Sequence, residues 1–182
     1  MKKITIITLV LLFGFCLTGN AQVHKASEHA ETKVKTSETK VKTSETKVKT
    51  ATKEECIAKC KEAAEMINKD GLDAAKAEIG KKDGKFVWKD TYVFLLDFNG
   101  KMLAHPVKPA LTEKENLLGV TDKNEKNPKK VFVEFIKIAK EKGEGWVDYM
   151  WPKPGSETPA VKDTYIYRVP GKDLIIGAGI YK

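Results

Sequence analysis

One histidine is the most informative position for chemistry in this 182-residue chain. His105 ends a predicted strand, precedes Pro106 and stands at the start of a long polar segment. At such a place an imidazole could donate to a carboxylate while neutral or charged, and the charged form becomes more available as pH falls toward ~6.5. The alternative is a structural histidine that bonds a backbone carbonyl and holds the Pro106 turn. The other histidines, His24 and His29, lie far upstream.

Aromatic side chains cluster on the predicted strands. Amphipathic rings form the apolar walls of a pocket and also supply a few hydroxyl or indole donors. Alternation along a strand places Tyr149 and Trp151 on one face and Trp146 on the other, where it belongs to the core. The predicted ligand-binding set is His105, Tyr92, Phe94, Tyr149, Trp151 and Tyr165, with Tyr167 on the same face as Tyr165.

Arg168 completes this set of candidates because it is the single arginine of the chain. A guanidinium suits bidentate binding of a carboxylate better than an ammonium does. Its position parity, however, turns it away from Tyr165 on the same strand. A surface ion pair is therefore the alternative interpretation of Arg168.

Signs of catalysis and of cofactor binding are lacking. The sequence contains no H-E-x-x-H zinc motif, no phosphate-binding G-x-x-x-x-G-K-[ST] loop and no recognisable Ser or Cys nucleophile. Gly177 and Gly179 lie inside a predicted strand, where close backbone packing or a bulge explains them better than a dinucleotide loop. Asp148 and Asp163 are expected to pair with lysines. We predict a protein that is not an enzyme and has no metal or cofactor.

The elements that must position these residues follow from periodicity and capping signals. Thr52 and Glu55 form a capping box for a helix that ends at Asp70-Gly71, and a shorter helix spans Leu72 to Ile79. Another helix is expected from Asn127-Pro128 to just before Gly143, after a polar crossover of residues 107–127 that is long enough to hide a short element. The predicted strands are Phe86–Asp97, Lys101–Pro106, Gly145–Trp151, Asp163–Val169 and Leu174–Tyr181. Short turns between them predict an antiparallel sheet covered by helices, an α+β fold.

Two cysteines, Cys56 and Cys60, lie one helical turn apart in the first helix. Their Cα atoms would be about 6 Å apart, near the upper limit for a disulfide, with poorly aligned Cβ vectors. In an oxidising compartment a disulfide is one interpretation. The other is two small apolar residues on a buried stripe.

The first 52 residues predict export and a solvated tether. Residues 1–21 have the Lys-Lys start, short apolar run and small residues at Ala21 of a cleaved secretory signal, which leaves no transmembrane anchor. Residues 22–52 repeat ETKVKTS with too few apolar side chains to fold. Much of the net charge of +8 belongs to this part, so the remaining domain is too weakly basic to suggest nucleic-acid binding. We predict a periplasmic or secreted location.

Three stretches in the remaining chain resemble the single Cache domain family (sCache_2-like). They are YVFLLDFNGKMLAHP at 92–106, GWVDYMWP at 145–152, and YIYRVPG at 165–171 with IGAGIY at 176–181. The resemblance covers residues 53–182 and implies one Cache domain, a long amino-terminal helix packed on a PAS-like five-stranded sheet. It further implies an extracytoplasmic sensor of a small organic ligand, often a short carboxylate. Since the sequence stops at Lys182 without an output domain, the expected partner is a membrane receptor or histidine kinase.

Two functions remain open on these observations. The first is sensing of a small organic acid in a concave, partly polar chamber on the sheet face away from the long helix. The second is an interaction or scaffold protein of the cell envelope, in which the basic tether makes the contacts and the domain has no small-molecule ligand.

Overall fold

The computed structural model describes residues 49–182, so the predicted signal peptide and most of the predicted tether lie outside the described residues. The chain forms α1 (Lys53–Asp70), α2 (Leu72–Ile79), β1 (Val87–Trp88), β2 (Thr91–Asp97), β3 (Met102–Ala104), a 3-10 turn η1 (Pro109–Thr112), α3 (Val131–Glu141), β4 (Glu144–Pro152), β5 (Pro159–Arg168) and β6 (Leu174–Tyr181). The fold is α+β, as the sequence predicted.

All strands belong to one antiparallel sheet. Its order is β1-β2-β6-β5-β4, and β3 pairs separately with β2. The final strand β6 therefore lies between β2 and β5, and brings the two hairpins of the sheet together. The sheet has six strands, not the five expected, because the predicted strand 86–97 is interrupted at Lys89, whose φ is 50°.

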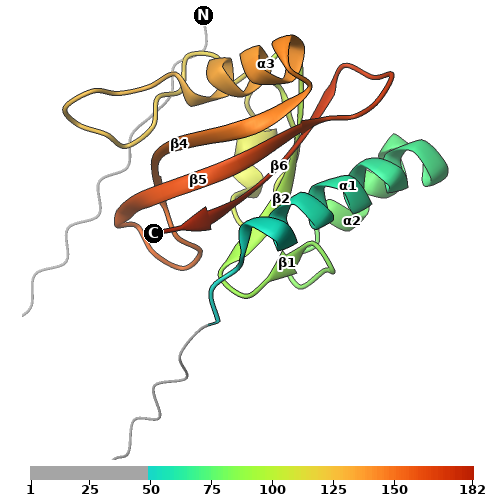
Figure 1. The fold of residues 1–182 in the computed structure, drawn as a ribbon, viewed down its shortest axis with the longest axis horizontal. Coiled ribbons are helices and arrows are strands. Elements are labelled where there is room, and N and C mark those ends of the chain that lie inside the picture. The colour runs from blue at the N-terminus through green and yellow to red at the C-terminus, as the bar shows by residue number, and fades with distance from the viewer. Residues whose placement is uncertain (1–48) are drawn as a thin grey trace, which may run out of the picture. The chain divides into compact units, whose positions relative to one another are not determined.

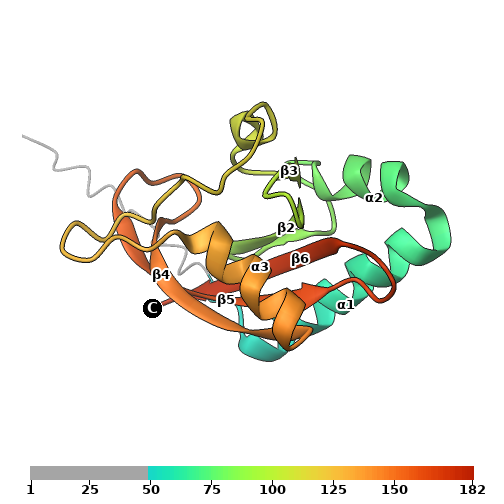
Figure 2. The same cartoon turned by 90° about the horizontal axis from the view of Figure 1, so that it is seen from above.

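Helices cover both faces of this sheet, and each face has its own core. Figure 1 shows the strands between α3 on one side and α1 with α2 on the other, and Figure 2 gives the same layers from above. Residues Val93, Leu95 and Ile176 point toward α1 and α2. The alternate residues of the same strands, such as Phe94 and Ile175, point toward α3. The period of two in a strand thus assigns neighbouring residues to different cores.

Two further boundaries differ from those expected. The helix predicted from Asn127-Pro128 begins only at Val131, and residues 127–130 precede it as irregular chain. The strand predicted from Asp163 begins at Pro159 and pairs with β4 over its whole length. The crossover does contain a short element, η1.

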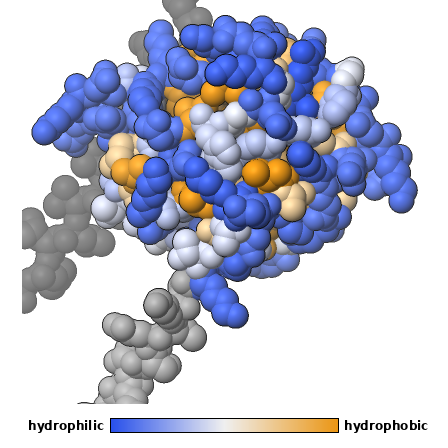
Figure 3. Space-filling model, in the orientation of Figure 1, coloured by the Kyte–Doolittle hydropathy of each residue, from blue (hydrophilic) through white to orange (hydrophobic). Residues whose placement is uncertain are grey.

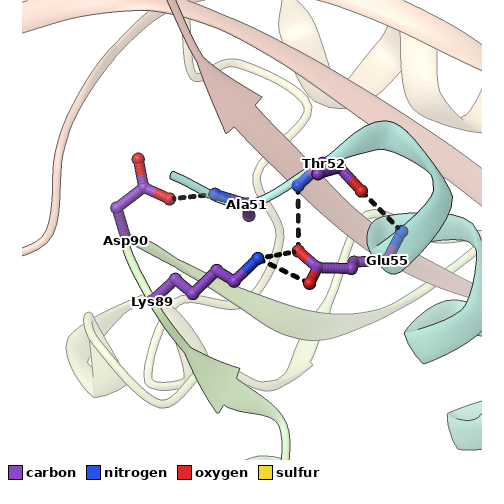
Figure 4. A network of polar contacts seen from close by, with 5 residues as sticks. All are labelled: Ala51, Thr52, Glu55, Lys89 and Asp90. Carbon is purple, nitrogen blue, oxygen red and sulfur yellow. Dashed lines mark hydrogen bonds and ion pairs between the residues drawn. The ribbon is translucent and has the colours of Figure 1, made fainter. Parts of the chain in front are cut away.

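The start of α1 is fixed to the β1–β2 turn by polar contacts (Figure 4). Thr52 and Glu55 form the predicted capping box, and Lys89 Nζ contacts both carboxylate oxygens of Glu55, one of them at 2.8 Å. The Ala51 N–H donates to Asp90 Oδ1 at 2.8 Å, and Ala51 is buried. Ala51 and Thr52, just before α1, are therefore also held in place by the β1–β2 turn and the capping box.

Cys56 and Cys60 are free thiols in the core beneath α1. Both are buried, and burial raises the pKa of Cys56 to about 12. They occupy the apolar stripe of the helix as small buried side chains, so the alternative of a disulfide between them is not what the structure shows.

The surface in Figure 3 is mainly hydrophilic, with apolar side chains in small separate groups. Large exposed apolar residues among those described are Leu72, Leu118, Val133 and Val161. Within residues 49–182, no helix has the length and apolar character needed to span a membrane.

Candidate functional site

A cavity lies between the sheet and α3, on the face away from α1. Its walls come from β2, β3, the residue after β3, η1, α3 and β4. The lining side chains are Tyr92, Phe94, Met102, His105, Leu111, Phe132, Phe135, Tyr149 and Trp151. The structure thus brings together five of the predicted ligand-binding residues, namely His105, Tyr92, Phe94, Tyr149 and Trp151, on the face that the sequence predicted.

The cavity itself is small. Its free volume is about 10 Å³, which is room for about one water molecule. The predicted chamber of molecular size is therefore not open in this structure, because the aromatic rings pack against one another across it. Phe135 contacts Phe94 and Tyr149 with ring centroids 5.7 and 5.5 Å apart. A ligand with two or more carbon atoms requires these walls or η1 to move apart.

His105 is held in one tautomer by the backbone that follows it. Its Nδ1 accepts hydrogen bonds from the N–H groups of Val107 at 3.2 Å and Lys108 at 2.9 Å. The ring is neutral, because burial, together with the nearby charges of Lys162 and Lys108, lowers the pKa of His105 to about 3. A neutral ring that accepts at Nδ1 carries its proton on Nε2.

This geometry leaves Nε2–H as a donor at the cavity wall. Among residues 49–182, the structure gives Nε2 no hydrogen-bond acceptor, and the ring lies 4.7 Å from Tyr92 between centroids. His105 does hold the turn after Pro106, but by accepting from backbone N–H groups and not by donating to a carbonyl as one interpretation had it. The structural role and a ligand contact are therefore compatible, since they use different nitrogens.

Lys162 is the functional candidate that the sequence did not reveal. Its side chain is fully buried, and Nζ has no hydrogen-bond partner among the described residues. Nζ lies 4.1 Å from the centroid of Tyr92 and 4.8 Å from that of Tyr181. Burial lowers the pKa of Lys162 to about 7. Since Tyr92 also lines the cavity, the ammonium lies next to one of the cavity walls.

The sequence would have indicated Lys162 only if the start of β5 had been placed correctly, at Pro159. With the strand beginning at Asp163, Lys162 falls in a polar turn and attracts no notice. With the strand beginning at Pro159, alternation places Lys162 on the same face as the buried Thr164 and Ile166. A lysine in a row of buried positions requires a partner or a function.

Two glycines of β6 leave space for side chains and backbone of the neighbouring strands at the cavity side of the sheet. A Cβ at Gly177 would overlap the Phe94 ring, and one at Gly179 would overlap the Thr164 hydroxyl and the Asp163 carbonyl. Thr164 Oγ1 is in turn 3.1 Å from the Tyr149 hydroxyl. The interpretation of close backbone packing at these glycines is confirmed, and it positions two residues of the cavity wall.

The crossover that closes the cavity is fastened to β4 by one buried carboxylate. Asp122 accepts hydrogen bonds from the N–H groups of Lys129 and Met150, each at 2.9 Å, and from Asn124 at 3.4 Å. Leu111 of η1 lies in the part of the crossover before this anchor and lines the cavity. The segment over the cavity is therefore tethered at His105 and at Asp122, with η1 between them.

Tyr165 does not line this cavity. The register pairs Tyr165 with Trp146, so both lie on the α1 face, opposite to Tyr149 and Trp151. The Tyr165 hydroxyl donates to Glu144 at 2.5 Å, and burial together with this carboxylate raises the pKa of Tyr165. Strand alternation alone could not place Tyr165, because the face of β5 depends on its register with β4.

Arg168 also lies away from the cavity. It shares the α3 face with Lys162 but stands six residues farther along β5, a distance of about 20 Å in a strand. Its guanidinium pairs with Asp173 at 3.0 Å and lies over the Phe98 ring. This is the surface ion pair that the sequence left open as the alternative.

Asp148 and Asp163 are engaged in the ion pairs with lysines that the sequence predicted. Asp148 pairs with Lys129 at 2.9 Å, and Asp163 pairs with Lys53 at 2.8 Å. Within the part of the chain that the structure describes, no group of His, Cys, Asp and Glu side chains has the arrangement of a metal site.

A Cache-domain family model, dCache_2, matches residues 17–182. The chain belongs to the Cache family. This agrees with the resemblance found in the sequence, although the single-Cache subtype is not the one that the model's name carries and stays a prediction. Cache domains are extracytoplasmic sensor domains, and the family is typically non-enzymatic and ligand-binding.

Two receptors are similar over about half of this chain. The methyl-accepting chemotaxis protein McpP of Pseudomonas putida KT2440 is 35% identical over 92 residues, and the sensor histidine kinase MctS of Rhizobium johnstonii is 31% identical over 93 residues. These matches cover 50% and 51% of this chain but only 16% and 19% of the two receptors. This chain is thus related to a small part of each protein.

Solved sensor domains have the same fold. A methyl-accepting chemotaxis protein from Vibrio parahaemolyticus is 29% identical, with a TM-score of 0.57, and the match covers 71% of this chain and 87% of that one. A Cache chemosensory domain solved for its recognition of carboxylic acid is 26% identical, with a TM-score of 0.54 and coverages of 68% and 84%.

Proposed function

We propose that this protein binds a short-chain carboxylate between the sheet and α3, and that it acts in extracytoplasmic sensing through a membrane receptor or histidine kinase. The observation that carries the proposal is the Nζ of Lys162, which is buried without a hydrogen-bond partner beside the cavity wall residue Tyr92. His105, whose Nδ1 is engaged by backbone N–H groups, lines the same mainly apolar cavity and offers Nε2–H as a second donor. Chemotaxis and kinase relatives, and a structural neighbour that recognises carboxylic acid, support it.

The two donors divide the recognition of a carboxylate between them. Lys162 supplies the positive charge, and burial away from water strengthens its attraction for an anion. His105 supplies one directional hydrogen bond. Once the walls or η1 move apart, the rings of Tyr92, Phe94 and Trp151 surround a short alkyl chain, and a longer chain would require a larger movement because the cavity has little free volume.

Export fits this function and remains part of the proposal. The signal sequence of residues 1–21 would be cleaved and the domain would work in the periplasm or outside the cell, held or spaced by the repeat of residues 22–52. A membrane receptor or a histidine kinase is the candidate partner that reads the bound state.

Isothermal titration at pH 6 with acetate, propionate, pyruvate and lactate tests the proposal. Propionamide, which has nearly the shape of propionate but no charge, is the matched ligand control. Lys162→Met is expected to abolish carboxylate binding, whereas Lys137→Met, at an exposed position on α3, is expected to leave it unchanged. Equal binding of propionate and propionamide, or no binding of any of the four acids, would contradict the proposal.

A further inference from the structure

Lys162 is buried without an opposite charge in contact with it. Its Nζ has no hydrogen bond and no carboxylate within ion-pair distance among residues 49–182. The faces of Tyr92 and Tyr181 are its nearest stabilising neighbours. Contact with ring faces offsets only part of the cost of removing an ammonium from water.

Titratable groups approach Lys162 from every element packed around it, and none of them neutralises its charge. The tyrosines are neutral, since burial raises the pKa values of Tyr92, Tyr149 and Tyr181. The remaining groups are His105 after β3, Lys108 before η1, Cys56 of α1 and Asp90 before β2.

These remaining groups divide into neutral, repulsive and occupied ones. His105 and Cys56 are neutral at pH 6 to 9, because their pKa values are about 3 and about 12. Lys108 is a cation and opposes a second positive charge. Asp90 is an anion that favours the charge on Lys162, but its carboxylate accepts from the Ala51 N–H and makes no ion pair with Nζ. Within residues 49–182, the chain therefore provides no anion in contact with the Lys162 ammonium.

We propose that a carboxylate binds here together with a proton that Lys162 takes up, so that the site responds to ligand concentration and acidity jointly. This inference rests on the proposed function and adds its regulation. The reaction is uptake of one proton from water by the neutral amine and binding of the anion by the resulting ammonium. Above the pKa of the lysine, the ratio of occupied to empty sites follows the product of carboxylate and proton concentrations. This product is proportional to the concentration of undissociated acid.

The size of the effect follows from the charge state of the empty site. With a Lys162 pKa of about 7, the empty site is almost fully protonated at pH 6 and about 3% protonated at pH 8.5. The dissociation constant for propionate is therefore expected to be about thirtyfold weaker at pH 8.5 than at pH 6. Propionate itself is ionised throughout this range, so its own titration contributes nothing.

Calorimetry of the full chain in buffers with different ionisation enthalpies, such as phosphate and Tris, measures the protons taken up per propionate bound. We expect about one proton at pH 8.5 and close to none at pH 6. Lys162→Arg keeps a charge at both pH values, and is expected to bind with no proton uptake and a dissociation constant independent of pH. Lys137→Met should behave as the unchanged protein does.

The outcomes separate this inference from the proposed function. Propionate binding that is equally tight at pH 6 and 8.5, with no proton taken up at either, overturns the coupling and leaves the function intact. An equal proton uptake by Lys162→Arg would assign the proton to another group and also overturn it. Absence of binding at pH 6 overturns both.

Discussion

Replacing Lys162 with methionine is expected to stabilise the protein without ligand. Burial lowers the pKa of this lysine from 10.5 to about 7, whereas in the unfolded chain it keeps the ordinary value. At ~1.4 kcal/mol per pKa unit, the difference corresponds to roughly 5 kcal/mol of unfolding free energy. Methionine has a similar volume and no charge, so it removes this cost while filling the same space.

The pH dependence of this stabilisation is a more specific test than its magnitude. Between pH 7 and 10.5 the unfolded chain holds the Lys162 proton and the folded protein does not, so this residue makes the free energy of unfolding rise with pH. The advantage of the Lys162→Met variant is therefore about 4 kcal/mol at pH 7.5 and shrinks by about 1.4 kcal/mol for each further pH unit. Other titrating groups are common to both proteins and cancel in the difference.

Urea denaturation at pH 7.5, 8.5 and 9.5, followed by tryptophan fluorescence, gives this difference directly. Lys137→Met is the control for removal of a lysine from the surface, and its difference from the unchanged protein should not vary with pH. A constant difference between the unchanged protein and Lys162→Met would show that Lys162 has an ordinary pKa. The reasoning about a buried, unpaired ammonium would then be refuted.

Two further predictions concern the cavity walls. His105 has a folded pKa of about 3 against 6.5 in the unfolded chain, so its contribution to the free energy of unfolding is lost as pH falls from 6.5 toward 3, by about 2 kcal/mol at pH 5. In urea denaturation, His105→Gln should lack this fall in stability between pH 6.5 and 5. The same fall in the variant as in the unchanged protein would contradict the prediction. Gly177→Ala places a methyl group in the Phe94 ring and should cost ~1–3 kcal/mol of unfolding free energy and weaken propionate binding. Gly119→Ala, where nothing lies within 4 Å, should change neither quantity, and equal effects of the two alanines would refute the packing argument.

Most of the fold could be predicted because its signals are local. The capping box at Thr52 and Glu55, the alternation through Tyr92 to Leu96 and the short turns between strands act over a few residues. Boundaries were missed where tertiary pairing decides them. Pro159 starts β5 because β4 is present to pair with it, and the residues after Asn127 stay outside the helix because Asp122 accepts the Lys129 N–H.

In the candidate site too, the features set within one strand could be predicted, and those set by pairing between segments could not. Tyr149 and Trp151 share a face by alternation within one strand, and the structure places both at the cavity. Tyr165 required the register between two strands, which alternation within one strand does not contain. The tautomer of His105 required the positions of two backbone N–H groups after the strand. Such relations arise only when the sheet is assembled.

A structural role alone does not account for Lys162. In that position an apolar side chain of the same length would pack against Tyr92 and Tyr181 without the cost of an unpaired charge. Surface solubility cannot explain the lysine either, because none of its side chain reaches solvent. In the proposed function, a ligand carboxylate supplies the missing counter-charge, and the instability of the empty site becomes part of the free energy that distinguishes the bound state from the empty one. The same residue thereby costs stability in the empty protein and provides the difference between two states on which a sensor depends.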